Sequence, residues 1–104
     1  MIIVNTPDIH NKKITETLAI ARGSTVRARN VGQDIFAGLK NIIGGEISEY
    51  TKLQAQSREQ ALQRMIEDAE RMGANAVINV RLTTSMVMQG CSEILAYGTA
   101  VVVE

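Results

Sequence analysis

One short segment gathers the soft sulfur donors of this chain. Met86-Val87-Met88-Gln89-Gly90-Cys91 carries two thioethers and the single thiol of the sequence. Such ligands suit Cu(I) and other thiophilic metals. A zinc site instead requires four nitrogen or sulfur ligands, usually with Cys-x-x-Cys pairs. The segment therefore indicates a soft-metal site built from Cys91, Met86 and Met88, to which a symmetric ring could bring one Cys91 per subunit.

A structural interpretation of the same segment stays open. Met86 and Met88 would be packing residues beside a hairpin turn at Gly90, and Cys91 would be a small apolar residue. The rest of the chain offers little acid–base or nucleophilic chemistry. His10 lies in a polar turn, and no spacing pairs it with Cys91 or a serine. We therefore expect a protein without catalytic activity.

Charge balance limits the classes of partner. Lys plus Arg and Asp plus Glu number 11 each, so the formal net charge is zero. A dedicated nucleic-acid or anionic-membrane binder usually shows a basic excess, and we expect neither partner here. Arg27 and Arg29 share a strand face without interleaved aromatic residues. A polar pocket formed by Arg27, Glu46 and Arg81 is a second candidate site.

The 104 residues predict one domain, residues 1–104, and the single cysteine fits a reducing compartment. No apolar run approaches the length of a membrane span, so a cytoplasmic protein is expected. The first elements are a strand over Ile2–Asn5 and a longer strand over Thr15–Arg29. Gly23-Ser24 predicts a bulge or a hairpin turn in the longer strand.

Two helices follow by apolar periodicity. Residues 30–43 place apolar side chains on one helical face, and residues 46–72 form a longer stripe that ends at Gly73. Gln54 and Arg58 interrupt this stripe, and Ser57-Arg58-Glu59-Gln60 matches a capping box, so two helices with a kink near Ser57 are the alternative. We favour one long helix. Residues 76–84 then alternate as a half-exposed strand, with Ala76, Ile78, Val80 and Leu82 inward.

The last strand, residues 94–103, is apolar on both faces and must be covered on both. The order β-β-α-α-β-β gives an α+β subunit in which one curved sheet packs on a long helix. A single helical layer covers one side of a sheet. We therefore expect a second subunit on the other side, at an interface of Leu95, Tyr97, Val101 and Val103.

These segments together resemble the YbjQ-like family of small bacterial proteins over the whole chain. The resemblance rests on Asn5-Thr6-Pro7, Ala21-Arg22-Gly23 to Arg29-Asn30, Gly38-Leu39 to Gly44-Gly45-Glu46 with Tyr50-Thr51, Gly73-Ala74-Asn75-Ala76-Val77, and Ala96-Tyr97-Gly98-Thr99-Ala100-Val101. It implies a dodecin-like subunit assembled as a homopentameric ring. The family carries a heavy-metal-binding label, which names no ligand motif among these residues.

Three functions follow as hypotheses. The first is a ring-forming protein that binds a small ligand or a soft or heavy metal ion at a subunit interface. The second is a structural scaffold for a protein partner. The third is a small enzyme with an interface site that uses Glu46, Arg27, Arg81 or Tyr97.

Overall fold

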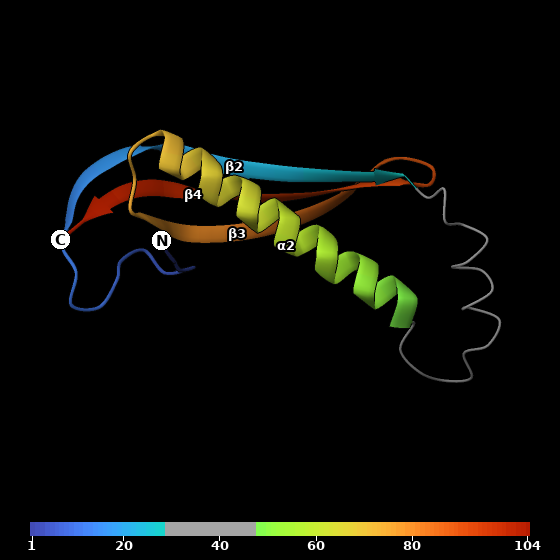
Figure 1. The fold of residues 1–104 in the computed structure, drawn as a ribbon, viewed down its shortest axis with the longest axis horizontal. Coiled ribbons are helices and arrows are strands. Elements are labelled where there is room, and N and C mark those ends of the chain that lie inside the picture. Colours follow the sequence, from blue (N-terminus) through green and yellow to red (C-terminus); the bar gives the residue numbers. More distant parts are fainter. Residues whose placement is uncertain (29–47) are drawn as a thin grey trace.

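The computed structural model describes residues 1–28 and 48–104. The described elements are β1 (Ile2–Ile3), β2 (Ile14–Ala28), α2 (Ser48–Arg71), β3 (Ala76–Met88) and β4 (Cys91–Val103). They form one open sheet in the order β1-β3-β4-β2, with β1 parallel to β3 and the other pairs antiparallel. α2 crosses one face of this sheet (Figure 1). The helix predicted over residues 30–43 and the residues Arg29 and Glu46 lie outside the described part of the chain.

α2 is one continuous helix, as the favoured interpretation of residues 46–72 predicts. Its stripe of Ala61, Met65 and Ala69 is fully buried against the sheet. No kink forms near Ser57, whose backbone carbonyl accepts a buried hydrogen bond from the Thr25 hydroxyl at 2.9 Å. The helix ends where Gly73 adopts a φ of 87°, a left-handed conformation that glycine tolerates best.

The predicted break at Gly23-Ser24 is wrong, because β2 runs through both residues. Its register irregularities lie earlier, between Ile14 and Glu16 and between Thr17 and Ala19. Gly23 has a different role. A Cβ added there would lie 2.5 Å from the carbonyl oxygen of Ala61 and would also clash with the backbone nitrogen of Met65. The glycine therefore allows the helix backbone to lie directly on the strand.

We predict that Gly23→Ala destabilises the fold by about 3 kcal/mol or more, because neither backbone can yield as a flexible side chain would. Urea unfolding measures the free-energy change. The matched control is Ser24→Ala, at the next position on the other face of β2, which should change stability by less than about 0.5 kcal/mol. Equal losses in the two variants would contradict the close-approach argument.

The alternation predicted for residues 76–84 is right only in part. β3 begins with both faces covered, because its first three residues are all buried. Asn79 then adopts a φ of 53°, and the register shifts between Ile78 and Arg81. This irregularity changes which residues face the helix, so Ile78 and Val80 pack in different clusters. Leu82, predicted to point inward, lies beyond the core and is 45% exposed.

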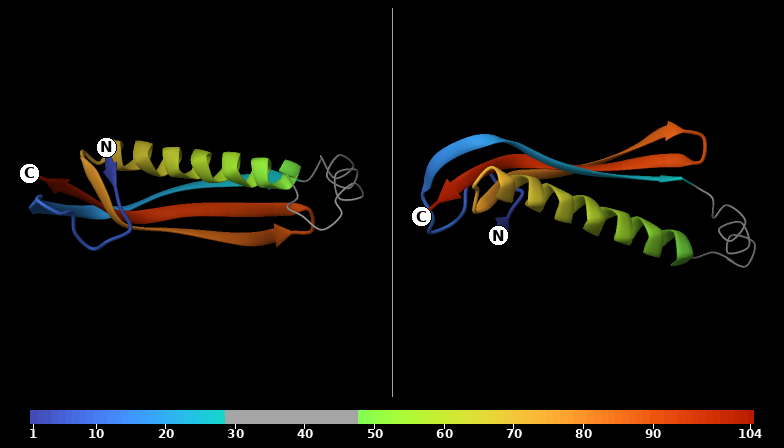
Figure 2. Two further views of the ribbon diagram at one scale, coloured as in Figure 1. Left: turned by 90° about the horizontal axis from the view of Figure 1, so that it is seen from below. Right: turned by 45° about the horizontal axis from the view of Figure 1, so that its top comes forward.

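β4 carries apolar residues on both faces, as predicted, but its second face is covered in an unexpected way. Ile94, Ala96 and Ala100 belong to the core beneath α2. Val101 and Val103 belong to a second cluster, against which Val4, Ile9 and Ile14 pack. Figure 2 shows the segment between β1 and β2 on the side of the sheet away from α2. The premise that only another subunit could cover this face is therefore wrong at the C-terminal end of β4.

Candidate functional site

Among the described residues, only the N-terminal segment covers the face of the sheet away from α2. We call the uncovered remainder the open face. Strand register assigns its members, which alternate with the residues beneath the helix: Ile20, Arg22, Ser24, Val26, Arg81, Thr83, Ser85, Glu93, Leu95, Tyr97 and Thr99. Ile20 is 65% exposed and Val26 is 55% exposed. Apolar side chains therefore line a surface that no part of the described chain covers.

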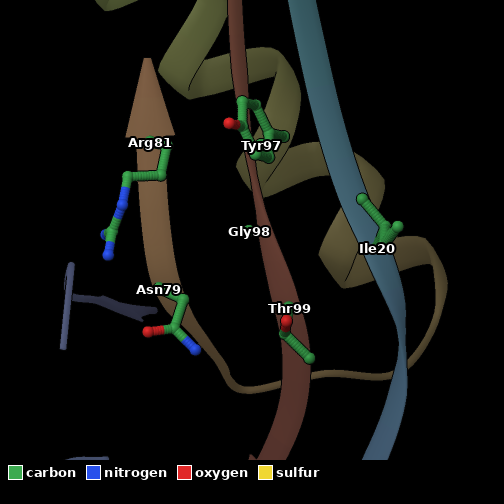
Figure 3. A pocket seen from close by; sticks show the side chains of 6 residues that line it. All are labelled: Ile20, Asn79, Arg81, Tyr97, Gly98 and Thr99. Carbon is green, nitrogen blue, oxygen red and sulfur yellow. The ribbon is translucent and has the colours of Figure 1, made fainter. Parts of the chain in front are cut away.

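A depression of about 320 Å³ lies in the open face. Figure 3 shows its lining, with Arg81 and Asn79 on β3, Tyr97 and Thr99 on β4, and Ile20 on β2. Three strands thus supply an aliphatic side chain, an aromatic ring, a hydroxyl, an amide and a guanidinium. This is the mixture of apolar surface and a few placed polar groups that is typical of small-molecule sites.

Arg81 is fixed rather than free. One of its terminal nitrogens donates to the carbonyl oxygen of Asn5 at 2.8 Å and to that of Val80 at 3.0 Å. No carboxylate of the described residues lies within ion-pair distance of it. The side chain therefore places a positive charge beside the depression without an ion-pair partner among the described residues, and its hydrogen bond to Asn5 ties it to the N-terminal segment.

The predicted pocket of Arg27, Glu46 and Arg81 is not assembled by the described residues. Arg27 donates to the side-chain carbonyl of Gln60 on α2 at 3.0 Å, and therefore lies on the helix side of the sheet. Arg81 lies on the opposite face, in register with Tyr97. Glu46 is outside the described part of the chain. Arg27 and Arg81 therefore belong to separate sites.

The structure brings together two of the three predicted sulfur ligands. Met88 and Cys91 are cross-strand partners on either side of a turn in which Gly90 adopts a φ of 79°. Met86 pairs with Ser92 and so points to the other face of the hairpin. Cys91 is a half-buried free thiol. The turn at Gly90 is therefore as predicted, while Met86 lies away from the Met88–Cys91 pair.

The methionines of this hairpin do not fill the core of the described subunit. Met86 is 75% exposed and Met88 is 65% exposed. His10 is exposed in the N-terminal segment, far along the chain from the hairpin. Among residues 1–28 and 48–104, no group of three or more His, Cys, Asp or Glu residues could hold a metal ion. Among the predicted metal ligands, Met88 and Cys91 are therefore the two that the described chain places side by side.

The four predicted interface residues divide into two pairs. Val101 is fully buried and Val103 is 6% exposed, both inside the subunit. Leu95 is half-buried and Tyr97 is 38% exposed, both on the open face. Sequence reasoning missed Ile20, Asn79 and Thr99 in the depression. The β2 irregularity and the positive φ of Asn79 decide where these side chains point, and neither leaves a clear periodic signal.

These observations define an α+β protein with one open sheet, one described helix and an uncovered sheet face. A family model described as "Putative heavy-metal-binding" matches residues 1–104. The chain is 58% identical over 101 residues to a UPF0145 protein of Methanosarcina acetivorans, covering 97% of this chain and 95% of the relative. A UPF0145 protein of Clostridioides difficile is 53% identical over 104 residues, covering 100% and 93%. The chain belongs to this family, whose function is uncharacterised.

A solved structure has a similar fold. It is the crystal structure of a protein of unknown function from the DUF74 family of Pediococcus pentosaceus, with a TM-score of 0.62 and 17% identity. The match covers 100% of this chain and 98% of that one. Within the part of the chain that the structure describes, no helix is long and apolar enough to cross a membrane.

We predict that Val101→Asp unfolds the subunit itself, because the new carboxylate would be buried without a partner in the cluster beneath Val4 and Ile9. Circular dichroism and thermal melting detect this loss. The matched control is Tyr97→Asp, on the same face of the same strand but 38% exposed, which should keep its secondary structure. A well-folded Val101→Asp variant would contradict the assignment of this cluster to the subunit core.

Proposed function

We propose that this protein is a non-catalytic homo-oligomer, a ring in which each open face is covered by a neighbouring subunit, and that it binds a small ligand at that interface. One observation carries the proposal. The N-terminal segment covers Val101 and Val103 at one end of the sheet, whereas Ile20 and Val26 are exposed on the same face further along. Exposed apolar side chains that gather on one face of a sheet, here with Leu95 and Tyr97 on the neighbouring strand, are typical of interaction sites in soluble proteins.

The shape of the subunit supports self-association. It extends 53 × 25 × 16 Å and has a radius of gyration of 17.0 Å. A compact domain of about 100 residues has a radius of gyration of roughly 13 Å. The subunit is therefore elongated rather than compact, and a second copy of the chain is the simplest partner that every cell making this protein contains. Ring closure and the number five rest on the family resemblance.

The depression around Tyr97 gives the interface its chemistry. The Tyr97 ring and Ile20 would hold the apolar body of a ligand, while Arg81 and the Thr99 hydroxyl would hold a polar or anionic end. A covering subunit would close a site that is shallow in the single chain.

A soft metal ion is the second class of ligand that we propose, and its ligands would come from the β3–β4 hairpin. The Cys91 thiol and the Met88 thioether lie on one face as cross-strand partners, which suits Cu(I) or another thiophilic ion. One chain supplies fewer ligands than zinc requires. In a ring, the Cys91 side chains of several subunits would complete such a site. Bound there, the ion would crosslink subunits rather than perform a reaction.

We predict that Leu95→Asp reduces the assembly to smaller species without unfolding it, because a carboxylate at an apolar interface loses hydration without gaining a partner. Native mass spectrometry should give a multiple of the 11.3 kDa subunit mass for the wild type, five for a pentamer. Gln63→Asp, on the exposed side of α2, is the control and should leave the mass unchanged. A wild-type protein that is monomeric at micromolar concentration would refute the ring.

We predict that Cu(I), Zn(II) or Cd(II) raises the melting temperature and that Cys91→Ser abolishes this rise. Met88→Leu should weaken the metal effect, because Met88 shares a face with Cys91. The control is Met86→Leu, the same substitution on the other face of the hairpin, which should retain the full effect. No shift with any of these metals, or equal loss in both methionine variants, would remove the metal hypothesis.

A further inference from the structure

A second depression lies between β2 and α2, away from the site proposed above. Its volume is about 400 Å³, and its lining comes from both elements: Thr25, Val26, Arg27, Gln60 and Arg64. The charged members are two arginines, one from each element. No carboxylate of the described residues forms an ion pair with either. Two positively charged side chains thus line one depression without a counter-charge among the described residues, an arrangement that favours an anion there.

Two acidic residues of α2, Glu67 and Asp68, lie three and four residues after Arg64, and neither forms an ion pair with it. Asp68 lies four residues after Arg64 on α2, a spacing at which helical side chains can pair. One of its oxygens instead accepts from the backbone nitrogen of Arg22 at 3.0 Å, and the other pairs with Arg71 at 3.3 Å. Asp68 therefore neutralises a different part of the surface, and among the described residues no carboxylate pairs with Arg64.

Both arginines are held in place by neutral acceptors. Arg64 donates from one terminal nitrogen to the carbonyl oxygen of Ser24 at 2.7 Å. Arg27 donates from one terminal nitrogen to the side-chain oxygen of Gln60 at 3.0 Å. These bonds use one nitrogen of each guanidinium and leave further N–H groups. The two cations are therefore positioned before any ligand arrives, which lowers the entropy cost of binding.

An orphaned donor points to the same conclusion. The Nε atom of Arg27 is buried and has no hydrogen-bond partner among the described residues. A buried polar atom without a protein partner is uncommon in folded proteins, and such an atom often meets a bound water or ion. The Nε and a terminal nitrogen of arginine form the fork that binds two oxygens of a phosphate or carboxylate. The Nε is covered in this structure, so the groups of Arg27 that can face the depression are the terminal N–H groups, and a small rotation of the guanidinium would be needed to bring Nε to an oxyanion there.

We propose that Arg27 and Arg64 form a binding site for a tetrahedral oxyanion of the phosphate class, between β2 and α2. Both arginines lie on the helix side of the sheet, whereas the interface ligand proposed above lies on the open face, so the two sites share no polar group, and only Val26 borders both surfaces. Free phosphate and the phosphoryl group of a larger molecule share the recognised chemistry. An oxyanion there would join β2 to α2 through both guanidinium groups and so stabilise the packing of the helix on the strand.

The test measures the melting temperature of the full-length protein in sodium phosphate and in sodium chloride at equal ionic strength. Phosphate should stabilise the wild type in a saturable manner, and chloride should not. Arg27→Gln and Arg64→Gln should each weaken the apparent phosphate affinity about tenfold or more, as expected for lost charge-assisted hydrogen bonds. Lys52→Gln is the control, because it removes one positive charge from an exposed position of the same helix without freeing Asp68.

Several outcomes would overturn the site. These are equal stabilisation by chloride, unchanged phosphate affinity in the Arg27 and Arg64 variants, or an equal loss in Lys52→Gln. Melting in chloride shows whether a variant is misfolded, and Arg64→Lys, which keeps the charge but loses the fork, should bind with intermediate affinity. If free phosphate binds, comparison with a phosphate monoester distinguishes a site for the ion from one for a larger phosphorylated molecule. Native mass spectra of the same samples report the ring separately.

Discussion

The close approach of one helix to one strand is the constraint on which the rest of the fold depends. Gly23 lies where a Cβ would meet the backbone of α2 at Ala61 and Met65. Ala21 on the strand and Ala69 on the helix are also fully buried. Small side chains on both elements bring the two backbones together, and large ones would separate them. With α2 this close, its polar side chains reach the edge of β2.

The polar side chains of α2 that contact β2 protect it as an edge strand of the sheet. The outer edge of β2 has backbone groups that no further strand of the described chain satisfies, and such edges invite uncontrolled pairing. Asp68 accepts from the Arg22 nitrogen, and Arg64 donates to the Ser24 carbonyl oxygen. One helix thus covers a face of the sheet and part of its edge. The same arrangement directs Arg64 toward Arg27 and produces the basic depression between β2 and α2.

β4 belongs partly to the subunit core and partly to the proposed interface. The N-terminal segment covers its C-terminal part, whereas the open face at its centre is uncovered by the described chain. Asn75 supports the sealed end with two bonds to the Val103 backbone, at 2.9 and 2.8 Å. Arg81 ties the N-terminal segment to β3 where the cover ends. The open face therefore begins at a fixed boundary, and the depression around Tyr97 lies beside it. A covering subunit would meet a preformed surface.

Local patterns along the chain were enough to predict the described elements and the need for cover on both sides of β4. Periodicity in residues 46–72 and the two apolar faces of residues 94–103 are such patterns, and the backbone converts them directly into a buried stripe and a buried strand. The family resemblance also rests on the residues alone. The fold in three dimensions was needed to show what covers Val101, why position 23 is a glycine, and which candidate ligands share a site: Arg27, Arg81, Met86, Met88 and Cys91. Those outcomes depend on one-residue irregularities in β2, β3 and the hairpin, each of which turns the following side chains to the opposite face.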